Sequence, residues 1–307
     1  GIKGIKLTLD EKRLIKNQKP WGIILFSRNI KDLFQLKSLI KDIRLLVKDK
    51  NYPILIDQEG GRVSRLNNIL DVTLFPQGFF GNLYKKKIYS FITLYKIYID
   101  TVCNLLNEVG ININTIPVLD IKRKSSHKII GDRSFSDQTE VVSKIGKICV
   151  DLCKKNKIGT VIKHVPGHGL SKIDSHYNLP IVNNKKNYLK NKDFKPFKDA
   201  TSFFAMTAHV VYSTYDNFNP ATHSKIIIND IIRDYMHFKG ILISDDICMK
   251  ALKFSLTENA TKALDAGCNI ILHCNGKIKE MNQLVKLVPK IDSFTQKKTS
   301  HFYKFLG

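Results

Sequence analysis

Seven short apolar runs recur along this 307-residue chain, separated by stretches with helical periodicity. Each run has the length of a strand, and most read as buried on both faces. The runs cover residues 21–27, 52–57, 111–120, 160–165, 203–210, 240–245 and 268–274. The amphipathic stretches include residues 33–48, 140–155 and 258–266. Such an alternation predicts parallel βαβ units.

The fold class that we predict is α/β, a single-domain (β/α)8 TIM barrel spanning residues 1–307. Residues 1–4 could be the remnant of a truncated first strand, which would raise the number of strands to eight. An open doubly wound sheet is the alternative, but no G-x-G-x-x-G follows the first run. We expect the tail at 276–307 to be helical and to cover the barrel wall. No linker or low-complexity segment divides the chain.

The composition restricts the partners of the chain. Its net charge of +23 could indicate nucleic-acid binding, but the lysines are scattered and no aromatic-interleaved RNA motif or zinc-finger spacing appears. We therefore predict no nucleic-acid partner. No run of about 18 apolar residues occurs, so we also predict no membrane span. The six cysteines form no C-x-x-C pair and suggest free thiols in a reducing compartment. The chain begins with Gly1, so any targeting signal is invisible rather than absent.

One segment concentrates ionisable side chains. The sequence KHVPGHG at residues 163–169 is followed by DSH at 174–176, which places three of the nine histidines within 14 positions. An apolar run precedes it, so a strand here leads into a loop rich in proline and glycine. In a barrel, the C-terminal ends of the strands form the active face. This loop is therefore the leading candidate for the chemistry.

Four further strand ends are also polar. A single acid at such a position often caps the next helix, but five polar ends together are poorly explained in that way. They indicate one functional face. The additional ends are DQEGGR at 57–62, Asp120, His209 and SDD at 244–246.

Four sequence blocks carry a family resemblance. They are DQEGGRV at 57–63, GDRSF at 131–135, K-H-x-P-G-H-G-x4-D-S-H at 163–176 and SDDICM at 244–249. In this order they resemble the bacterial β-N-acetylglucosaminidases of glycoside hydrolase family 3, especially the single-domain cytoplasmic enzymes of cell-wall recycling. The resemblance runs nearly end to end, from WGIILFSRN at 21–29 to ALDAGC at 263–268.

The resemblance implies a cytoplasmic β-N-acetylhexosaminidase that needs no cofactor and no metal, and we expect a monomer. It implies that the enzyme removes terminal β-linked N-acetylglucosamine from muropeptide-derived, anhydro-muramyl disaccharides. In the family pattern Asp245 matches the nucleophile of a retaining mechanism and His176 the acid/base, a role for which an imidazole is suited near neutral pH. Asp174 would orient the His176 ring, whereas strand alternation points Asp246 elsewhere.

Five positions match sugar-binding residues of the family. The resemblance implies that Asp57 accepts hydrogen bonds from sugar hydroxyls and that the basic residues donate to hydroxyls and to the N-acetyl group. We expect His168 and His209 only to shape the site. Val165, Leu170 and Cys248 depart from the family pattern, at positions without an assigned role. The five matched positions are Asp57, Arg65, Arg133, Lys163 and His164.

Three other functions remain open at this point. A metal-dependent hydrolase could use His164, His168, Asp174 and His176, although no H-x-H or H-E-x-x-H spacing appears. A binding protein that has lost catalysis is a second alternative, but Asp245, Asp174 and His176 are intact. A family 3 β-glucosidase is the third, although such relatives usually carry a second domain and lack the 163–176 loop.

Overall fold

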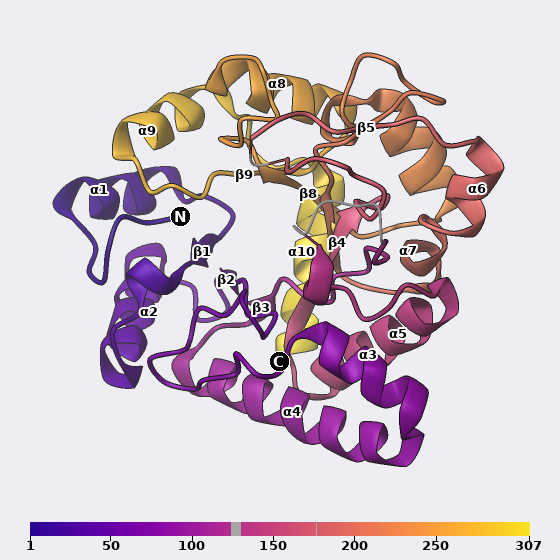
Figure 1. Ribbon diagram of the computed structural model, residues 1–307. Coiled ribbons are helices and arrows are strands. Elements are labelled where there is room, and N and C mark those ends of the chain that lie inside the picture. Colours follow the sequence, from indigo (N-terminus) through magenta and orange to yellow (C-terminus); the bar gives the residue numbers. More distant parts are fainter. Residues whose placement is uncertain (124–129, 176) are drawn as a thin grey trace.

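The computed structural model describes residues 1–123, 130–175 and 177–307. Seven parallel strands form one curled sheet in the order β1-β2-β3-β4-β6-β8-β9, with helices on its outer side (Figure 1). A short parallel pair, β5 and β7, lies apart from it. The strands are β1 (Ile23–Leu25), β2 (Ile54–Ile56), β3 (Ile113–Asn114), β4 (Gly159–Val165), β5 (Ile181–Val182), β6 (Phe204–Thr207), β7 (Val211–Tyr212), β8 (Ile241–Asp246) and β9 (Ile270–Leu272).

Each strand of the main sheet lies inside, or within one residue of, one of the seven predicted apolar runs. The predicted barrel of parallel βαβ units is thereby confirmed. The helices are α1 (Leu9–Gln18), α2 (Leu33–Val47), α3 (Gln77–Lys86), α4 (Ile88–Val109), α5 (Thr139–Lys155), α6 (Lys186–Asn191), α7 (Lys195–Asp199), α8 (Leu256–Ala266), α9 (Ile278–Leu287) and α10 (Ser293–Leu306), with short 3₁₀ helices at Ser27–Asn29, Gly131–Arg133 and Ala221–His223 and a π-helix at Ile227–Tyr235.

Local sequence signals account for the ends of the elements. Helix α8 begins two residues before the predicted stretch because Ser255 and Glu258 form a capping box there. Gly267 ends it in the left-handed conformation, with φ +114°. Strand β3 is much shorter than its apolar run, because the Ile116 N–H turns back to the Asn114 carbonyl at 2.9 Å and Pro117 has no N–H, so that pairing with β4 resumes only at Val118.

Two apolar layers hold the barrel together. The inner layer fills the curled sheet with one face of each strand, including Ile24, Val161 and Phe204, and it also contains Phe302 of α10. The outer layer packs the opposite strand faces against the surrounding helices. Burial of both faces explains why the strands read as continuous apolar runs.

The C-terminal tail is helical as predicted, but only part of it covers the wall. Helix α9 packs against α8 and α1 on the outside. Helix α10 instead crosses the N-terminal end of the strands, where the Phe302 ring lies 5.0 Å from that of Phe204. Gly159 at the start of β4 makes room for it, since a Cβ there would lie 2.6 Å from the Phe302 ring. The prediction that the whole tail covers the wall is wrong for α10.

The sheet is not closed by hydrogen bonds between β9 and β1 within the described residues. A cavity of about 1060 Å³ lies there, lined by both strands and by α1 and α9. Residues 1–4, predicted as the remnant of a strand, form none. They lie between the ends of the two strands, where the Ile2 carbonyl accepts from Arg28 and Asn29 (3.0 and 3.1 Å).

All six cysteines are free thiols, as predicted. Four are buried, and Cys248 and Cys274 are half-buried. In the part of the chain that the structure describes, no helix combines the length and the apolar character that crossing a bilayer requires.

Candidate active site

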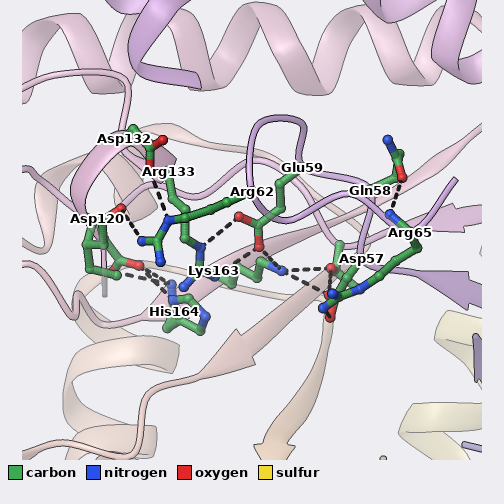
Figure 2. Close-up of polar contacts among 12 residues, drawn as sticks. Asp57, Gln58, Glu59, Arg62, Arg65, Asp120, Asp132, Arg133, Lys163 and His164 are labelled. Atoms are coloured by element: carbon green, nitrogen blue, oxygen red, sulfur yellow. Dashed lines mark hydrogen bonds and ion pairs between the residues drawn. The ribbon is translucent and has the colours of Figure 1, made fainter. Parts of the chain in front are cut away.

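Polar side chains from several strands meet at the C-terminal edge of the sheet. Asp57 follows β2, and Thr115 follows β3. Lys163 and His164 lie near the end of β4, and Asp245 near the end of β8. Parallel strands bring these ends to the same side of the barrel, and Figure 2 shows the cluster around Lys163.

Lys163 is the centre of this cluster. Its ammonium donates to Asp57 Oδ1 at 3.0 Å and to Thr115 Oγ1 at 2.8 Å, and its Nζ lies 2.6 Å from Glu59 Oε1. An ammonium has three protons, so these three contacts saturate it. The Lys163 side chain is only 3% exposed. Burial alone would lower its pKa, but the two carboxylates raise it, so the lysine stays charged.

Asp57 is held ionised and partly open to solvent. It also accepts a hydrogen bond from Thr115 and pairs with Arg65 Nη2 at 3.2 Å. Burial acts to raise the pKa of Asp57, but Lys163 and Arg65 hold it well below its usual range. Its side chain remains 17% exposed, so a lone pair is available to an incoming hydroxyl.

Glu59 connects Arg133 to the same cluster. The Arg133 guanidinium donates to it through two bonds of 2.8 and 2.9 Å, a bidentate geometry (Figure 2). Burial raises the pKa of Glu59, but Arg133 and Lys163 outweigh it and lower the pKa to about 2. The chain turns directly after Glu59 at Gly60 and Gly61, whose φ values of +91° and +59° favour glycine.

Asp120 fixes the backbone of the loop after β4. One of its oxygens lies 2.6 Å from His164 Nδ1, and the other accepts the His168 N–H at 2.6 Å. The carboxylate is fully buried. Burial would raise its pKa, but His164 outweighs this and lowers it, so the group accepts as an anion.

His168 connects this anchor to the predicted acid/base segment. Its Nε2 lies 3.0 Å from Ser175 Oγ, between Asp174 and position 176. Burial lowers the pKa of His168 to about 4, so its ring is neutral near pH 7. Asp174 is half-buried in a turn, where its carbonyl accepts the N–H of Tyr177 at 3.1 Å. His176 lies outside the described residues.

The two acids at the end of β8 have different surroundings. Asp245 Oδ1 accepts the N–H of Asp246 at 2.8 Å. Burial opposes the ionisation of Asp245, but His164 and His209 lower its pKa. Asp246 Oδ1 accepts the N–H groups of Cys248 and Cys274, both at 3.2 Å. Asp246 thus joins two loops, in agreement with the prediction that it points away from the chemistry.

His209 has a partner on each ring nitrogen. Its Nε2 lies 3.0 Å from the Asp246 carbonyl, which can only accept, so this nitrogen carries the proton. Its Nδ1 lies 2.7 Å from Thr222 Oγ1. Burial lowers the pKa of His209. These contacts fit the shaping role expected for this histidine.

The structure brings the five predicted sugar-binding residues into one region and places Asp245 within electrostatic range of His164 and Lys163. Glu59, Thr115 and Asp120 had no predicted role. Both acids stood at polar strand ends, and Glu59 also lies in the DQEGGRV block at 57–63. Thr115 lies inside an apolar run and carried no such signal.

Known proteins resemble this chain over most of its length. Residues 2–300 match the family described as the glycosyl hydrolase family 3 N terminal domain. A curated protein named beta-hexosaminidase from Glaesserella parasuis is 34% identical over 285 residues, which cover 89% of this chain and 79% of that protein. Another of that name, from Actinobacillus pleuropneumoniae, is 34% identical over 291 residues, with the same coverage.

Solved structures show the same similarity. Native NagZ from Neisseria gonorrhoeae superposes with a TM-score of 0.88 at 29% identity, covering 99% of this chain and 88% of that one. A family 3 beta-N-acetylglucosaminidase from Paenibacillus has a TM-score of 0.86 at 28% identity. The match covers 99% of the present chain, which spans 60% of the length of the Paenibacillus chain.

Proposed function

The chain belongs to glycosyl hydrolase family 3, as a β-N-acetylhexosaminidase-type hydrolase, and from that premise we propose that it is a retaining exo-β-N-acetylglucosaminidase. The proposed substrate is the terminal β-linked N-acetylglucosamine of anhydro-muramyl disaccharide fragments of the cell wall. We also propose that the enzyme works in the cytoplasm as a monomer.

The state of Asp245 is the observation that carries the retaining mechanism. It is ionised, and among the described residues no ion pair engages it, whereas Asp57 and Glu59 are both paired. A half-buried carboxylate of this kind can attack the anomeric carbon and form a glycosyl-enzyme. As the glycosidic bond breaks, its oxygen takes a proton from His176. The same imidazole later removes a proton from the water that attacks the anomeric carbon and releases the Asp245 carboxylate.

The cluster around Lys163 supports the binding of a sugar ring. The partly exposed carboxylate of Asp57 can accept from ring hydroxyls, and Arg65 is 26% exposed beside it. Because the charged side chains of this cluster are already paired in the free enzyme, they do not need to rearrange when the substrate binds. The relative NagZ from Neisseria gonorrhoeae has been solved with N-trifluoroacetyl-D-glucosamine, in agreement with an N-acetylated sugar here.

The proposed activity predicts the anomer of the first product. Two successive inversions at the anomeric carbon return the β configuration. Proton NMR at early times, with p-nitrophenyl β-N-acetylglucosaminide, should show β-N-acetylglucosamine before mutarotation. The matching β-glucoside, the control, should react far more slowly. Initial α-product would exclude the retaining mechanism, and equal or faster turnover of the glucoside would contradict the proposed substrate.

The acid/base proposal predicts a titration that belongs to His176. Over about pH 5 to 8, Asp245 stays ionised and His168 stays neutral, because both pKa values lie below that range. A general acid must be protonated, so kcat/KM for a poor leaving group should fall as pH rises through the His176 pKa. His176→Ala should lose this limb of the profile and should retain more activity on activated aryl glycosides.

His168→Asn is the matched control. Its kcat/KM should be lower than that of the wild type but should still fall as pH rises through the His176 pKa. Asp174→Ala should resemble His176→Ala but more weakly, and the two effects should be non-additive, because both act through one imidazole. If the fall of kcat/KM with pH survived in His176→Ala, or if the variant lost activity equally on all leaving groups, His176 would contact the substrate and would not be the acid/base.

A further inference from the structure

Three side chains of ligand type converge just beyond the ends of β8 and β9, apart from the Lys163 cluster. Cys248 follows β8, His273 follows β9, and Glu280 lies in the first turn of α9. Figure 1 shows these elements as neighbours on one side of the barrel, and β8 pairs with β9. The sulfur, imidazole and carboxylate ligand atoms all lie within 4.8 Å of one another.

The separations come close to those around a metal ion. Cys248 Sγ lies 3.7 Å from Glu280 Oε2, and His273 Nε2 lies 2.9 Å from the same oxygen. A tetrahedral zinc ion, with bonds of about 2.0–2.3 Å, holds its ligand atoms about 3.3–3.7 Å apart. To hold such an ion, the nitrogen–oxygen pair would have to open by about half an ångström, and the sulfur and the imidazole nitrogen, now within 4.8 Å of each other, would have to lie about 3.5 Å apart.

The side-chain amide of Asn275 occupies the position that a cation would take between these ligand atoms. Asn275 Nδ2 donates to Glu280 Oε2 at 2.6 Å and to Cys248 Sγ at 3.4 Å. It therefore bridges the sulfur and the oxygen, as a cation would. Its own Oδ1 accepts the N–H of Lys277 at 2.9 Å, which fixes the amide in this orientation.

Charged groups of both signs surround these three side chains: the Lys277 ammonium lies 3.0 Å from Glu280 Oε1, and the Gly1 ammonium donates to the His273 carbonyl at 2.5 Å. The Cys248 sulfur itself lies near two carboxylates, those of Asp246 and Glu280, and Glu280 Oε2 is 3.7 Å from it.

We propose that Cys248, His273 and Glu280 form a binding site for a thiophilic divalent cation, best matched by zinc. Sulfur, imidazole and carboxylate together are a zinc-type donor set, and a fourth position is left for water. On binding, the thiol releases its proton to solvent, the His273 ring changes tautomer so that its proton sits on Nδ1 and Nε2 is free to bind, and the cation displaces the Asn275 amide. This site differs from the His164–His168–Asp174–His176 cluster considered from the sequence.

The proposed site is coupled to the end of β8 without taking part in the chemistry. Asp246 Oδ1 holds the backbone of Cys248 and also that of Cys274, next to His273. A bound ion would cross-link the same two loops from their side chains. The expected result is a more stable loop pair beside Asp245.

Cobalt(II) tests this proposal, because its thiolate complexes have a charge-transfer absorption in the near ultraviolet. Titration of the metal-free protein with cobalt should produce this band and saturate at one equivalent. Cys248→Ser should abolish the band. His273→Gln and Glu280→Gln should each weaken binding by about 10-fold or more, since each removes a ligand. Cys274→Ser is the matched control and should keep the band.

The absorption band separates this site from cobalt bound elsewhere, because the candidate active site contributes no cysteine to the cluster of Figure 2. A second measurement is the melting temperature, which zinc should raise in the wild type and in Cys274→Ser but not in Cys248→Ser. Cobalt binding without a thiolate band, or a band that survives in Cys248→Ser, would overturn the proposal. Neither measurement depends on hydrolysis.

Discussion

Asp245→Asn is expected to lower turnover by on the order of 10³-fold or more, because an amide cannot form the covalent intermediate. Asparagine has nearly the same volume and keeps an oxygen that can accept the N–H of Asp246. The loss would therefore report on chemistry and not on folding. Steady-state kinetics on an aryl β-N-acetylglucosaminide measures it.

Asp246→Asn is the matched control, one position along the same strand. Its remaining oxygen can still accept from Cys248 or Cys274, so we expect a much smaller loss of turnover. A mechanism-based label that traps the glycosyl-enzyme should map to the peptide that contains Asp245. An inactive Asp246→Asn beside an active Asp245→Asn would reverse the assignment of the nucleophile.

Lys163→Met is expected to have the largest effect on stability. The substitution removes the ammonium that Asp57 and Glu59 share and leaves the buried carboxylate of Glu59 and the partly exposed carboxylate of Asp57 each with one fewer partner. Breaking a buried ion pair from one side typically costs about 3–5 kcal/mol. We expect a loss of this order in the free energy of unfolding, measured by denaturant titration at pH 7, together with a loss of activity.

Two further variants show whether the loss comes from the buried charges. Lys37→Met removes an ion pair of similar length, 2.8 Å, but in an exposed position, and should change stability by less than about 1 kcal/mol. Glu59→Gln in the Lys163→Met background should be less destabilising than the sum of the single changes, because it removes one unpaired carboxylate. Strict additivity, or equal losses for Lys37→Met and Lys163→Met, would contradict the account of the cluster.

Much of the architecture could be predicted because its signals are local. An apolar run of strand length, or a capping pair such as Ser255 and Glu258, depends on a few neighbouring residues. The same holds for the 163–176 motif, whose spacing identified the loop and the family. Helix α10 was placed wrongly because an amphipathic pattern predicts that one face is buried but does not say against which surface.

The sequence by itself determined the alternation of strands and helices and the polar strand ends, since each follows from patterns within short segments, and the family resemblance supplied the candidate site residues. Only the tertiary structure decided which of them pair. Glu59 meets Arg133 across 74 residues, and Lys163 meets Asp57 across 106. Cys248 meets Glu280 across 32 residues, in a cluster for which the spacing of ligands in the sequence gave no motif. Such contacts depend on how the β-strands and loops are arranged around the barrel. No pattern within a short segment specifies which residues far apart in the sequence come together.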